Sequence, residues 1–451
     1  MIVSFSVTNF RSFSTEETFS LVASNRLSGR HEDHAIPIPD SEERVLRTAV
    51  LYGANGAGKS NLFKALQYVK SIALDTRPKN GGTGRDAFRF GGIAHEPSVF
   101  DLRFIVANRF YRLGFTIDDH QIREEWLVQL IGGRERTIYE RVTSDDGSVT
   151  IRAPGLEGVK LRALATIGGP QNQSFLATIQ ATLELADLGD ELGGIFYWFR
   201  YDLNLMAPGE PLSYLQRMLS RDPDLVEFAG DFLRASSTGV DHLVILRSTI
   251  SSQEFDSLFS RRDLSKGLGQ GLDGSSIFVV ADETVVVKPL TDDRWEQFSV
   301  KTAHKSLTGD LVAMKLAEES DGTRRLLDLI PALYSLGISG GVCFVDEIDR
   351  SLHPMLVRNF LEHFLRTADR GQRQLIMTTH ESNLLDQDLL RRDEIWFAEK
   401  DPAGATHLYS LMDFKVRNDL EIRKHYLQGR FGAVPFLGDP ARLPAETNQP
   451  A

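Results

Sequence analysis

Cysteine is almost absent from this sequence of 451 residues. The single thiol, Cys343, cannot form an internal disulfide, and its apolar neighbours in GVCFV indicate that it packs in a core. The sequence also lacks an apolar run of the roughly 18 residues that a transmembrane helix needs, and its N-terminus lacks the basic start and apolar core of a signal peptide. These absences exclude a disulfide-bonded secreted scaffold, and we expect a cytoplasmic protein without a membrane partner.

Basic residues are not in excess either. The sequence holds 51 lysines and arginines against 62 acidic residues, which gives a formal net charge of -11. This balance excludes a surface that binds polyanions in general, so any contact with nucleic acid has to be local. With 41% hydrophobic and 25% charged residues, the composition is that of a folded globular chain.

A glycine-rich loop is the strongest signal in the sequence. It consists of Gly53, Ala54, Asn55, Gly56, Ala57, Gly58, Lys59 and Ser60, and we expect these residues and the following Asn61 to bind a nucleotide. An apolar strand is expected before it, at residues 48–52, and a helix with one apolar stripe is expected from Ser60 onward. This arrangement predicts a phosphate-binding loop, in which glycines let successive backbone N–H groups converge on phosphate oxygens. Lys59 would then reach the β- and γ-phosphates of a nucleotide, and the Ser60 hydroxyl would ligate Mg²⁺.

Two adjacent acids follow a second apolar segment. In VCFVDEIDRSLHP, Asp346 and Glu347 come at the carboxyl end of an expected buried strand, where open α/β sheets bind ligands. We expect Asp346 to hold the Mg²⁺ ion and Glu347 to orient or deprotonate an attacking water. Read alone, either acid could instead cap a helix. The loop at residues 53–60 favours the catalytic interpretation.

Together these motifs resemble the ABC/SMC/RecF group of ATPases, and the resemblance extends to three further segments. ESDGTRRLL resembles the signature motif, which implies that Ser320 and Gly322 point at the γ-phosphate bound by another subunit. QLIMTTHES resembles the switch segment, which implies that His380 contacts the γ-phosphate. FSVTNFRSF resembles the first strand of SMC and RecF heads, which implies that Arg11 lies near the nucleotide. Read alone, ESDGT is an ordinary N-capped helix start, and His380 is a structural residue at a strand end.

The sequence departs from the ABC/SMC/RecF pattern at two segments, the D-loop and the Q-loop. The segment 349–353 resembles the D-loop, but His353 stands where transporters commonly carry Asp. No glutamine can be assigned to the Q-loop, which couples transporter ATPases to their membrane partner. A transporter ATPase is therefore not expected.

Over nearly its whole length, the sequence resembles the bacterial AAA-type ATPases of abortive infection and phage defence, of the AbiL and overcoming-lysogenization-defect types. The resemblance rests on NFRSF, GANGAGKSN, ESDGTRRL, VDEIDRSLHP, TTHESNLLD and the C-terminal block YLQGRFGAVPFL. It implies an ATP-hydrolysing switch that controls a separate effector, which is a nuclease or a toxin. Too few residues follow His380 for the nuclease domain of overcoming-lysogenization-defect proteins, so Asp386 and Asp388 are not expected to cleave nucleic acid.

The expected fold class is α/β, an ABC/SMC-type P-loop ATPase head with an antiparallel β lobe and a mixed, largely helical insertion. Residues 1–154 are expected to form the first half of the head and residues 155–308 the insertion. Residues 309–438 would form the second half, with the signature, the acid pair and the switch histidine, and residues 439–451 a disordered tail. Because signature and phosphate loop act across a subunit boundary in this group, the resemblance implies a homo-oligomer, at least a dimer, that binds ATP and Mg²⁺.

Two other functions stay open. One is a RecF-like ATPase of DNA repair or maintenance, which the acidic net charge disfavours. The other is a nucleotide-dependent scaffold without hydrolysis, against which Glu347 argues. Nucleic acid stays open as a partner.

Overall fold

A computed structural model gives the structure of the chain. It describes residues 1–27, 29–79, 81–209, 213–258, 276–280, 283–291, 293–338, 340–367, 371–415 and 421–434. The chain divides into two compact units, unit 1 (Met1–Leu205 with Gln374–Ala451) and unit 2 (Met206–Arg373). The predicted disordered tail, residues 439–451, lies outside the described residues. Among the helices within these ranges, none combines the length and the apolarity that crossing a bilayer needs.

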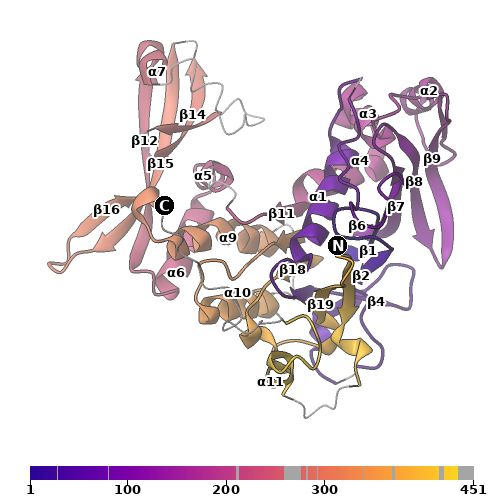
Figure 1. The fold of residues 1–451 in the computed structure, drawn as a ribbon. Helices are drawn as coiled ribbons and strands as arrows, with labels where there is room; N and C mark the ends of the chain where they lie inside the picture. The colour runs from indigo at the N-terminus through magenta and orange to yellow at the C-terminus, as the bar shows by residue number, and fades with distance from the viewer. Residues whose placement is uncertain are drawn as a thin grey trace, which may run out of the picture. The chain divides into compact units, whose positions relative to one another are not determined.

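An antiparallel sheet forms the first layer of unit 1 (Figure 1). Its strands in order are β10 (Val149–Arg152), β9 (Arg134–Thr143), β8 (Ile122–Ile131), β7 (Arg109–Ile117), β6 (Ser98–Val106), β1 (Ile2–Thr8) and β2 (Glu17–Ser20). Alternation along each strand separates the faces: Phe100, Leu102 and Phe104 of β6 are buried, whereas Asp101 and Arg103 point to the other face. The predicted antiparallel lobe is thereby confirmed.

A second sheet of unit 1 brings together segments from both ends of the sequence, drawn indigo and yellow in Figure 1. Its neighbours in order are β18 (Arg373–Thr378), β5 (Thr48–Tyr52), β19 (Ile395–Lys400) and β20 (Thr406–Ser410). β5 pairs in parallel with β18 and with β19, and every residue of β5 is buried. A fully apolar strand suits this position, because parallel sheets are covered on both faces. The α/β class expected from the sequence is confirmed.

Gln374 links the two sheets of unit 1. Its fully buried amide receives the Ile2 N–H at 2.7 Å and donates to the carbonyls of Ile2 and Leu46, each at 2.8 Å. All these bonds join residues far apart in sequence, so they hold β18 on β1 only in the folded chain.

Helices complete unit 1. They are α1 (Lys59–Leu74), α2 (Val159–Ile167), α3 (Phe175–Thr182), α4 (Gly189–Tyr197) and α11 (Ile422–Leu427), and a short hairpin consists of β3 (Ala35–Pro37) and β4 (Arg44–Leu46). The stripe expected on α1 is buried, with Leu62, Leu66, Val69 and Ala73 all facing the core. α3 begins against the buried carboxylate of Glu125, which accepts the Phe175 N–H at 2.7 Å and the Tyr139 hydroxyl at 2.6 Å. Burial raises the pKa of Glu125 above its ordinary value.

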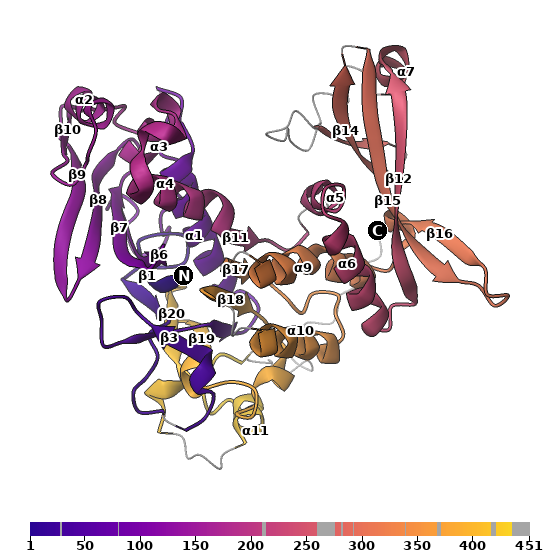
Figure 2. The ribbon, with the colours of Figure 1, turned by 180° about the vertical axis from the view of Figure 1, so that it is seen from behind.

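Unit 2 contains the second part of the predicted insertion and the signature and acid-pair segments. Its helices are α5 (Ser213–Leu219), α6 (Pro223–Ala235), α7 (Ser252–Leu258), α9 (Asp321–Ile338) and α10 (Pro354–Thr367), and β17 (Gly341–Val345) precedes the acids. An antiparallel sheet, seen in Figure 2, pairs β12 (Val240–Ser251), β15 (Arg294–Lys305), β14 (Glu283–Thr291) and β13 (Ser276–Val280) in that order, with β16 (Leu311–Lys315) on β15. The predicted insertion is thus mixed, helical mainly before Ser236 and sheet mainly after it. β11 (Leu203–Met206) spans the boundary between the units.

The described part of the C-terminal block YLQGRFGAVPFL, residues 426–434, packs against β19, which is the neighbour of the strand β5 that carries the glycine-rich loop. Tyr426 and Phe431 are buried, and their rings lie 5.7 and 6.0 Å from that of Phe397. The Tyr409 hydroxyl lies 2.9 Å from the Phe431 carbonyl and 2.9 Å from Glu399. The described part of this block, up to residue 434, therefore serves as a core element of unit 1.

The packing of this block requires a glycine at position 432. Its φ of +67° is left-handed, and an added Cβ would lie 2.5 Å from the Glu399 carboxylate and 2.6 Å from the Tyr409 hydroxyl. We predict that Gly432→Ala lowers the free energy of unfolding by about 2–4 kcal/mol, through backbone strain and overpacking together. The matched control, Gly133→Ala, has φ +76° and open space around its Cβ, so it reports the strain alone, about 1–2 kcal/mol. Urea unfolding of both variants checks this, and equal losses would contradict the packing role.

Candidate functional site

The glycine-rich loop connects β5 to α1 in unit 1 and is shaped by close approaches. Gly56 and Gly58 have φ of +80° and +111°, which side chains disfavour. An added Cβ at Gly53 would lie 2.6 Å from the Ala398 carbonyl, and one at Gly58 would overlap the Thr406 side chain. The tip, at Asn55 and Gly56, is exposed, and Ala54 is partly exposed. The loop therefore presents backbone at its surface and allows no side chain at its two ends.

The start of α1 has the polarity of an anion site. No side chain caps the helix at Gly58, and its first turn holds no acidic residue. Because backbone N–H groups at a helix start point outward along the axis, this end favours a negative charge. Ser60 lies half-buried in the first turn. The residues present therefore fit a phosphate group, as the sequence motif predicts.

Lys59 and His380 meet beside this loop, although 320 residues separate them. The Lys59 ammonium donates to the carbonyls of Gly53 at 2.8 Å and Ala54 at 3.2 Å, and it lies 3.0 Å from His380 Nε2. Since an ammonium group only donates, Nε2 is the acceptor. Lys59 is only 5% exposed, so its charge is held close to the loop and largely shielded from water. The structure thus brings two of the three predicted catalytic residues together.

A hydrogen-bonded clamp that the sequence analysis missed holds the loop from behind. The Thr406 hydroxyl donates to the Ala57 carbonyl at 2.8 Å and lies 2.8 Å from the Ser12 hydroxyl. Asn61 donates to the same Ser12 hydroxyl at 2.7 Å, and the Thr406 N–H donates to the Ser12 carbonyl at 2.7 Å. The Asn61 side chain, predicted to contact the nucleotide, is thus engaged with the scaffold. Nothing in local sequence marks Thr406, since its partners lie far away along the chain.

Arg11 is placed next to this clamp but faces another residue. Its backbone is left-handed, with φ +52°, and its N–H donates to the Asp86 carbonyl at 2.6 Å. Its guanidinium lies 3.4 Å from the Asp86 carboxylate. The predicted contact between Arg11 and a nucleotide stays a prediction.

The acid pair ends β17 in unit 2. Asp346 is 2% exposed, and its N–H donates to the Met206 carbonyl at 2.9 Å. Glu347 is partly exposed and has a left-handed backbone with φ +51°. Such a conformation is uncommon for a residue other than glycine, and it gathers at functional sites where surrounding contacts hold it. A buried acid therefore adjoins a partly exposed one within this turn.

Ser320 starts α9 on the surface of unit 2. Its side-chain oxygen accepts the Thr323 N–H at 3.1 Å, so the ordinary cap of a helix start is formed. The residue itself is exposed. The buried Glu319 just before it is anchored on β15, where His304 Nε2 lies 2.6 Å from its carboxylate and Thr302 donates to the same oxygen. The signature segment is thus fixed in place with Ser320 facing outward.

Gly322 packs against segment 349–353 of the same unit. An added Cβ would lie 2.9 Å from the Ser351 carbonyl, so a glycine allows the close approach. His353, at the unusual position of this loop, accepts the Met355 N–H at 3.2 Å and caps the start of α10. In this chain His353 therefore has a structural partner in its own helix.

The predicted site residues form one group in each unit. Unit 1 holds the loop, Lys59 and His380, whereas unit 2 holds Asp346, Glu347 and the signature. Within the described residues, no group of three His, Cys, Asp or Glu side chains could hold a metal ion. Nucleotide-bound Mg²⁺ needs only one or two protein ligands, because phosphate and water oxygens supply the rest. Ser60 in unit 1 and Asp346 in unit 2 each carry an oxygen donor of the kind that Mg²⁺ takes, and their assignment as its ligands stays a prediction.

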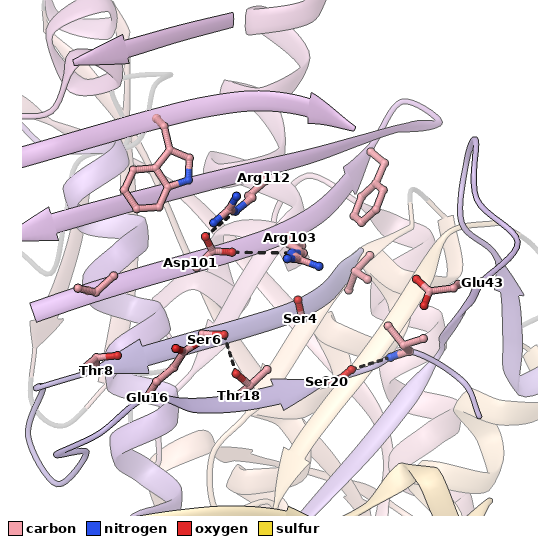
Figure 3. Close-up of a pocket in the computed structure, with 15 residues that line it drawn as sticks. Ser4, Ser6, Thr8, Glu16, Thr18, Ser20, Glu43, Asp101, Arg103 and Arg112 are labelled. Carbon is pink, nitrogen blue, oxygen red and sulfur yellow. Dashed lines mark hydrogen bonds and ion pairs between the residues drawn. The ribbon is translucent and has the colours of Figure 1, made fainter. Parts of the chain in front are cut away.

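Two other features are separate from these groups. A cavity of about 540 Å³ lies on the outer face of the antiparallel sheet and is lined by hydroxyls such as Ser4 and Ser6 (Figure 3). At its centre Asp101 pairs with Arg112 at 2.6 Å and with Arg103 at 3.9 Å, and its lining includes none of the predicted site residues.

Cys343 is buried, as expected, and burial raises the pKa of its thiol to about 12.

The pair after the switch histidine has turn contacts. Asp386 accepts the Asp388 N–H at 2.9 Å, and the exposed Asp388 carboxylate lies 3.6 Å from Arg30. These contacts are those of a surface turn, and the expectation that the pair does not cleave nucleic acid stays a prediction.

Comparison with known protein families assigns the chain to one of them. Its sequence matches the family model described as "AAA domain, putative AbiEii toxin, Type IV TA system" over residues 49–158 and 214–386, which is more than half of the chain. The chain belongs to this family of AAA domains. The family predicted from the motifs is thereby confirmed. Among curated proteins, the sequence finds no match.

Solved structures of SMC heads are similar to this chain at low identity. The SMC head domain from Thermotoga maritima has 14% identity and a TM-score of 0.38, covering 91% of this chain and 98% of that one. An Smc head bound to the C-winged helix domain of ScpA has 14% identity and a TM-score of 0.40, covering 91% and 97%. A head with an extended coiled coil, bound to the C-terminal domain of ScpA derived from Pyrococcus furiosus, has 11% identity and a TM-score of 0.38, covering 91% and 96%. At these values neither a site nor a partner is transferred to this chain.

The clamp on the loop gives a prediction about the Thr406 hydroxyl. We expect Thr406→Val to lower the free energy of unfolding by about 1–3 kcal/mol, because the buried Ala57 carbonyl loses its donor while the side-chain volume is kept. Thr406→Ser keeps the hydroxyl and should retain most of the stability. Urea unfolding measures both, and a larger loss for the serine variant would contradict the clamp.

Proposed function

We propose that the protein is an ATPase that binds ATP with Mg²⁺ at the loop of residues 53–60 and hydrolyses it with the acid pair of unit 2. The observation that carries this proposal is the buried Lys59 ammonium, held by two loop carbonyls and His380 at the uncapped start of α1. A fixed positive charge at a helix start is what a transferring phosphoryl group requires. The family, an AAA domain family, is consistent with nucleotide binding.

Each residue has a distinct task in this proposal. The loop backbone and Lys59 hold the phosphates, and His380 lies beside the same ammonium to contact the γ-phosphate. Ser60 and Asp346 would hold Mg²⁺, which supplies positive charge between the phosphate oxygens when bound. Glu347, which is partly exposed and has a left-handed backbone, would orient or deprotonate the attacking water.

The site requires a second copy of the chain. Ser320 and Asp321 are exposed at the start of α9, so they are available to another subunit. We propose a homodimer in which Ser320 and Gly322 of one copy complete the nucleotide site of the other. A two-fold arrangement of this kind closes without leaving an unpaired signature surface.

We further propose that ATP binding and hydrolysis switch a separate effector, a nuclease or toxin, in phage defence. Two observations support this division of labour. The family description names a toxin of a type IV system, and the described residues after His380 form strands and the C-terminal block of unit 1. The destructive chemistry would then lie in a partner protein of the cytoplasm, and ATP would set the state of the switch.

The acid pair yields the first test of hydrolysis. Glu347→Gln should slow ATP turnover by about 10²–10⁴-fold, since it removes the base, while ATP and Mg²⁺ binding persist. Asp346→Asn should instead weaken Mg²⁺ binding, and Lys59→Ala should abolish turnover in a folded protein. Glu227→Gln, an exposed acid on α6, is the matched control and should behave as wild type. Steady-state turnover and equilibrium nucleotide binding separate these effects. The roles are misassigned if the Asp346 and Glu347 variants lose nucleotide affinity equally.

The switch yields a prediction at the level of the cell. The purified chain should hydrolyse ATP and leave DNA and RNA intact, and protection against phage should need both Lys59 and a protein encoded by a neighbouring gene. Phage challenge with and without the neighbouring genes, using wild type and Lys59→Ala, measures this. Nuclease activity of the purified chain that disappears with Asp388→Asn would rule out a separate effector.

A further inference from the structure

Arg325 is a buried cation on the signature helix with few partners. It lies in the second turn of α9, five residues after Ser320, and is only 7% exposed. It makes no ion pair within the described residues, and its Nε is buried without a hydrogen-bond partner there. A buried charge without an ion pair costs free energy, so the position of Arg325 points to a role beyond packing.

The two hydrogen bonds of Arg325 lead to the acid pair. Its Nη2 donates to the backbone carbonyl of Asp346 at 3.2 Å and to that of Glu347 at 3.3 Å. One nitrogen thus spans both residues of the turn that ends β17. Glu347 is the residue with the left-handed backbone, so the bond reaches the strained position itself.

The electrostatic surroundings of Arg325 agree with this placement. Burial lowers the pKa of its guanidinium, while the negative charges of Asp328, Glu347 and Asp346 oppose that shift. Arg350 adds to the lowering. The guanidinium is therefore close enough to both acids to act on them, although it forms no ion pair with either.

We infer that Arg325 is a positioning residue, which holds the turn at Asp346 and Glu347 in its working shape and ties it to the signature helix. This inference rests on the proposed ATPase function and adds a residue to it. When the signature contacts the nucleotide of a second copy, the position of α9 would change. Because Arg325 lies on α9 and binds the turn, the positions of Asp346 and Glu347 in the same subunit would change with it. A shift of about 1 Å in a reacting group can change a rate by about 10²-fold, so two main-chain bonds suffice for such control.

A purely structural role is the alternative, and Arg373 provides the comparison. Arg373 is also buried in unit 2, at 3% exposure, and also donates to a main-chain carbonyl, that of Thr367 at 2.8 Å. Its contact lies at the end of α10 and not at the acid pair. Both arginines are buried and donate to main-chain carbonyls, and of the two only Arg325 has a hydrogen bond given to the turn of Asp346 and Glu347.

The experiment compares Arg325→Met, Arg325→Lys and Arg373→Met in the full-length protein. Methionine keeps volume and flexibility without a charge, and a buried charge can often be replaced in this way without loss of the fold. For Arg325→Met we expect kcat to fall by about 10- to 100-fold with KM for ATP unchanged within about twofold. Arg325→Lys should recover part of the rate, and Arg373→Met should keep the wild-type kcat even if its melting temperature falls. If Arg325→Met does not fold, the lysine variant carries the same comparison.

A double variant shows whether Arg325 acts through Glu347. If it does, Arg325→Met combined with Glu347→Gln is no slower than Glu347→Gln alone, because the positioned group is already gone. Multiplicative losses together with unchanged Mg²⁺ affinity in Arg325→Met would overturn the inference, because neither acid would then depend on Arg325. A wild-type kcat in Arg325→Met or an equal loss in Arg373→Met would also overturn it. The proposed function fails separately, if the wild-type protein shows no turnover that depends on Glu347.

Discussion

The Lys59 ammonium is buried, and much of the arrangement around it follows from that one constraint. A buried charge is tolerated only when hydrogen-bond acceptors surround it, and here Gly53, Ala54 and His380 supply them. Those acceptors converge only if the loop is tightly curled and if β18, which leads to His380, pairs with β5, which leads to the loop. Glycines at both ends of the loop and the Thr406 hydroxyl behind it meet the first condition. The parallel pairing of two apolar strands meets the second.

The acid pair in unit 2 depends on a different constraint, a strained turn. A left-handed Glu347 costs free energy of the order of 1–3 kcal/mol and persists only where its surroundings hold it. The Met206 carbonyl holds the N–H of Asp346, and Arg325 holds the carbonyls of both acids. At this turn Asp346 is buried and Glu347 is partly exposed, and we propose that the first serves the metal and the second the water. We propose that α9 both presents the signature to the nucleotide of another copy and supports the turn of the acid pair. Nucleotide binding and hydrolysis would then depend on the same helix.

The sequence predicted those features that local patterns encode. The loop between β5 and α1, the antiparallel lobe and the acids after β17 each carry a short motif or a periodicity, and the structure has them at the expected residues. Ser12, Thr406 and Arg325 escaped prediction because their partners lie far away in sequence, and no spacing marks such contacts. The left-handed backbone of Glu347 was hidden for the same reason, since a glutamate gives no sign of its φ. For Arg11 a motif predicts a nucleotide contact, which stays a prediction, and the structure places its guanidinium near Asp86. The assembly of the two groups into one site stays a proposal.

The central claim is that the loop of one copy and the signature of another complete each ATP site. The most direct measurement is ATP turnover by purified mixed dimers of Lys59→Ala subunits and Ser320→Arg subunits, with each homodimer as control. Ser320 is the better signature position for this test, because its side chain is exposed, whereas Gly322 packs on Ser351 of its own subunit. Both homodimers should be inactive, and the mixed dimer, with one intact site, should recover up to about half of the wild-type rate. Absence of turnover in verified mixed dimers, or wild-type turnover by the Ser320→Arg homodimer, would contradict the shared site.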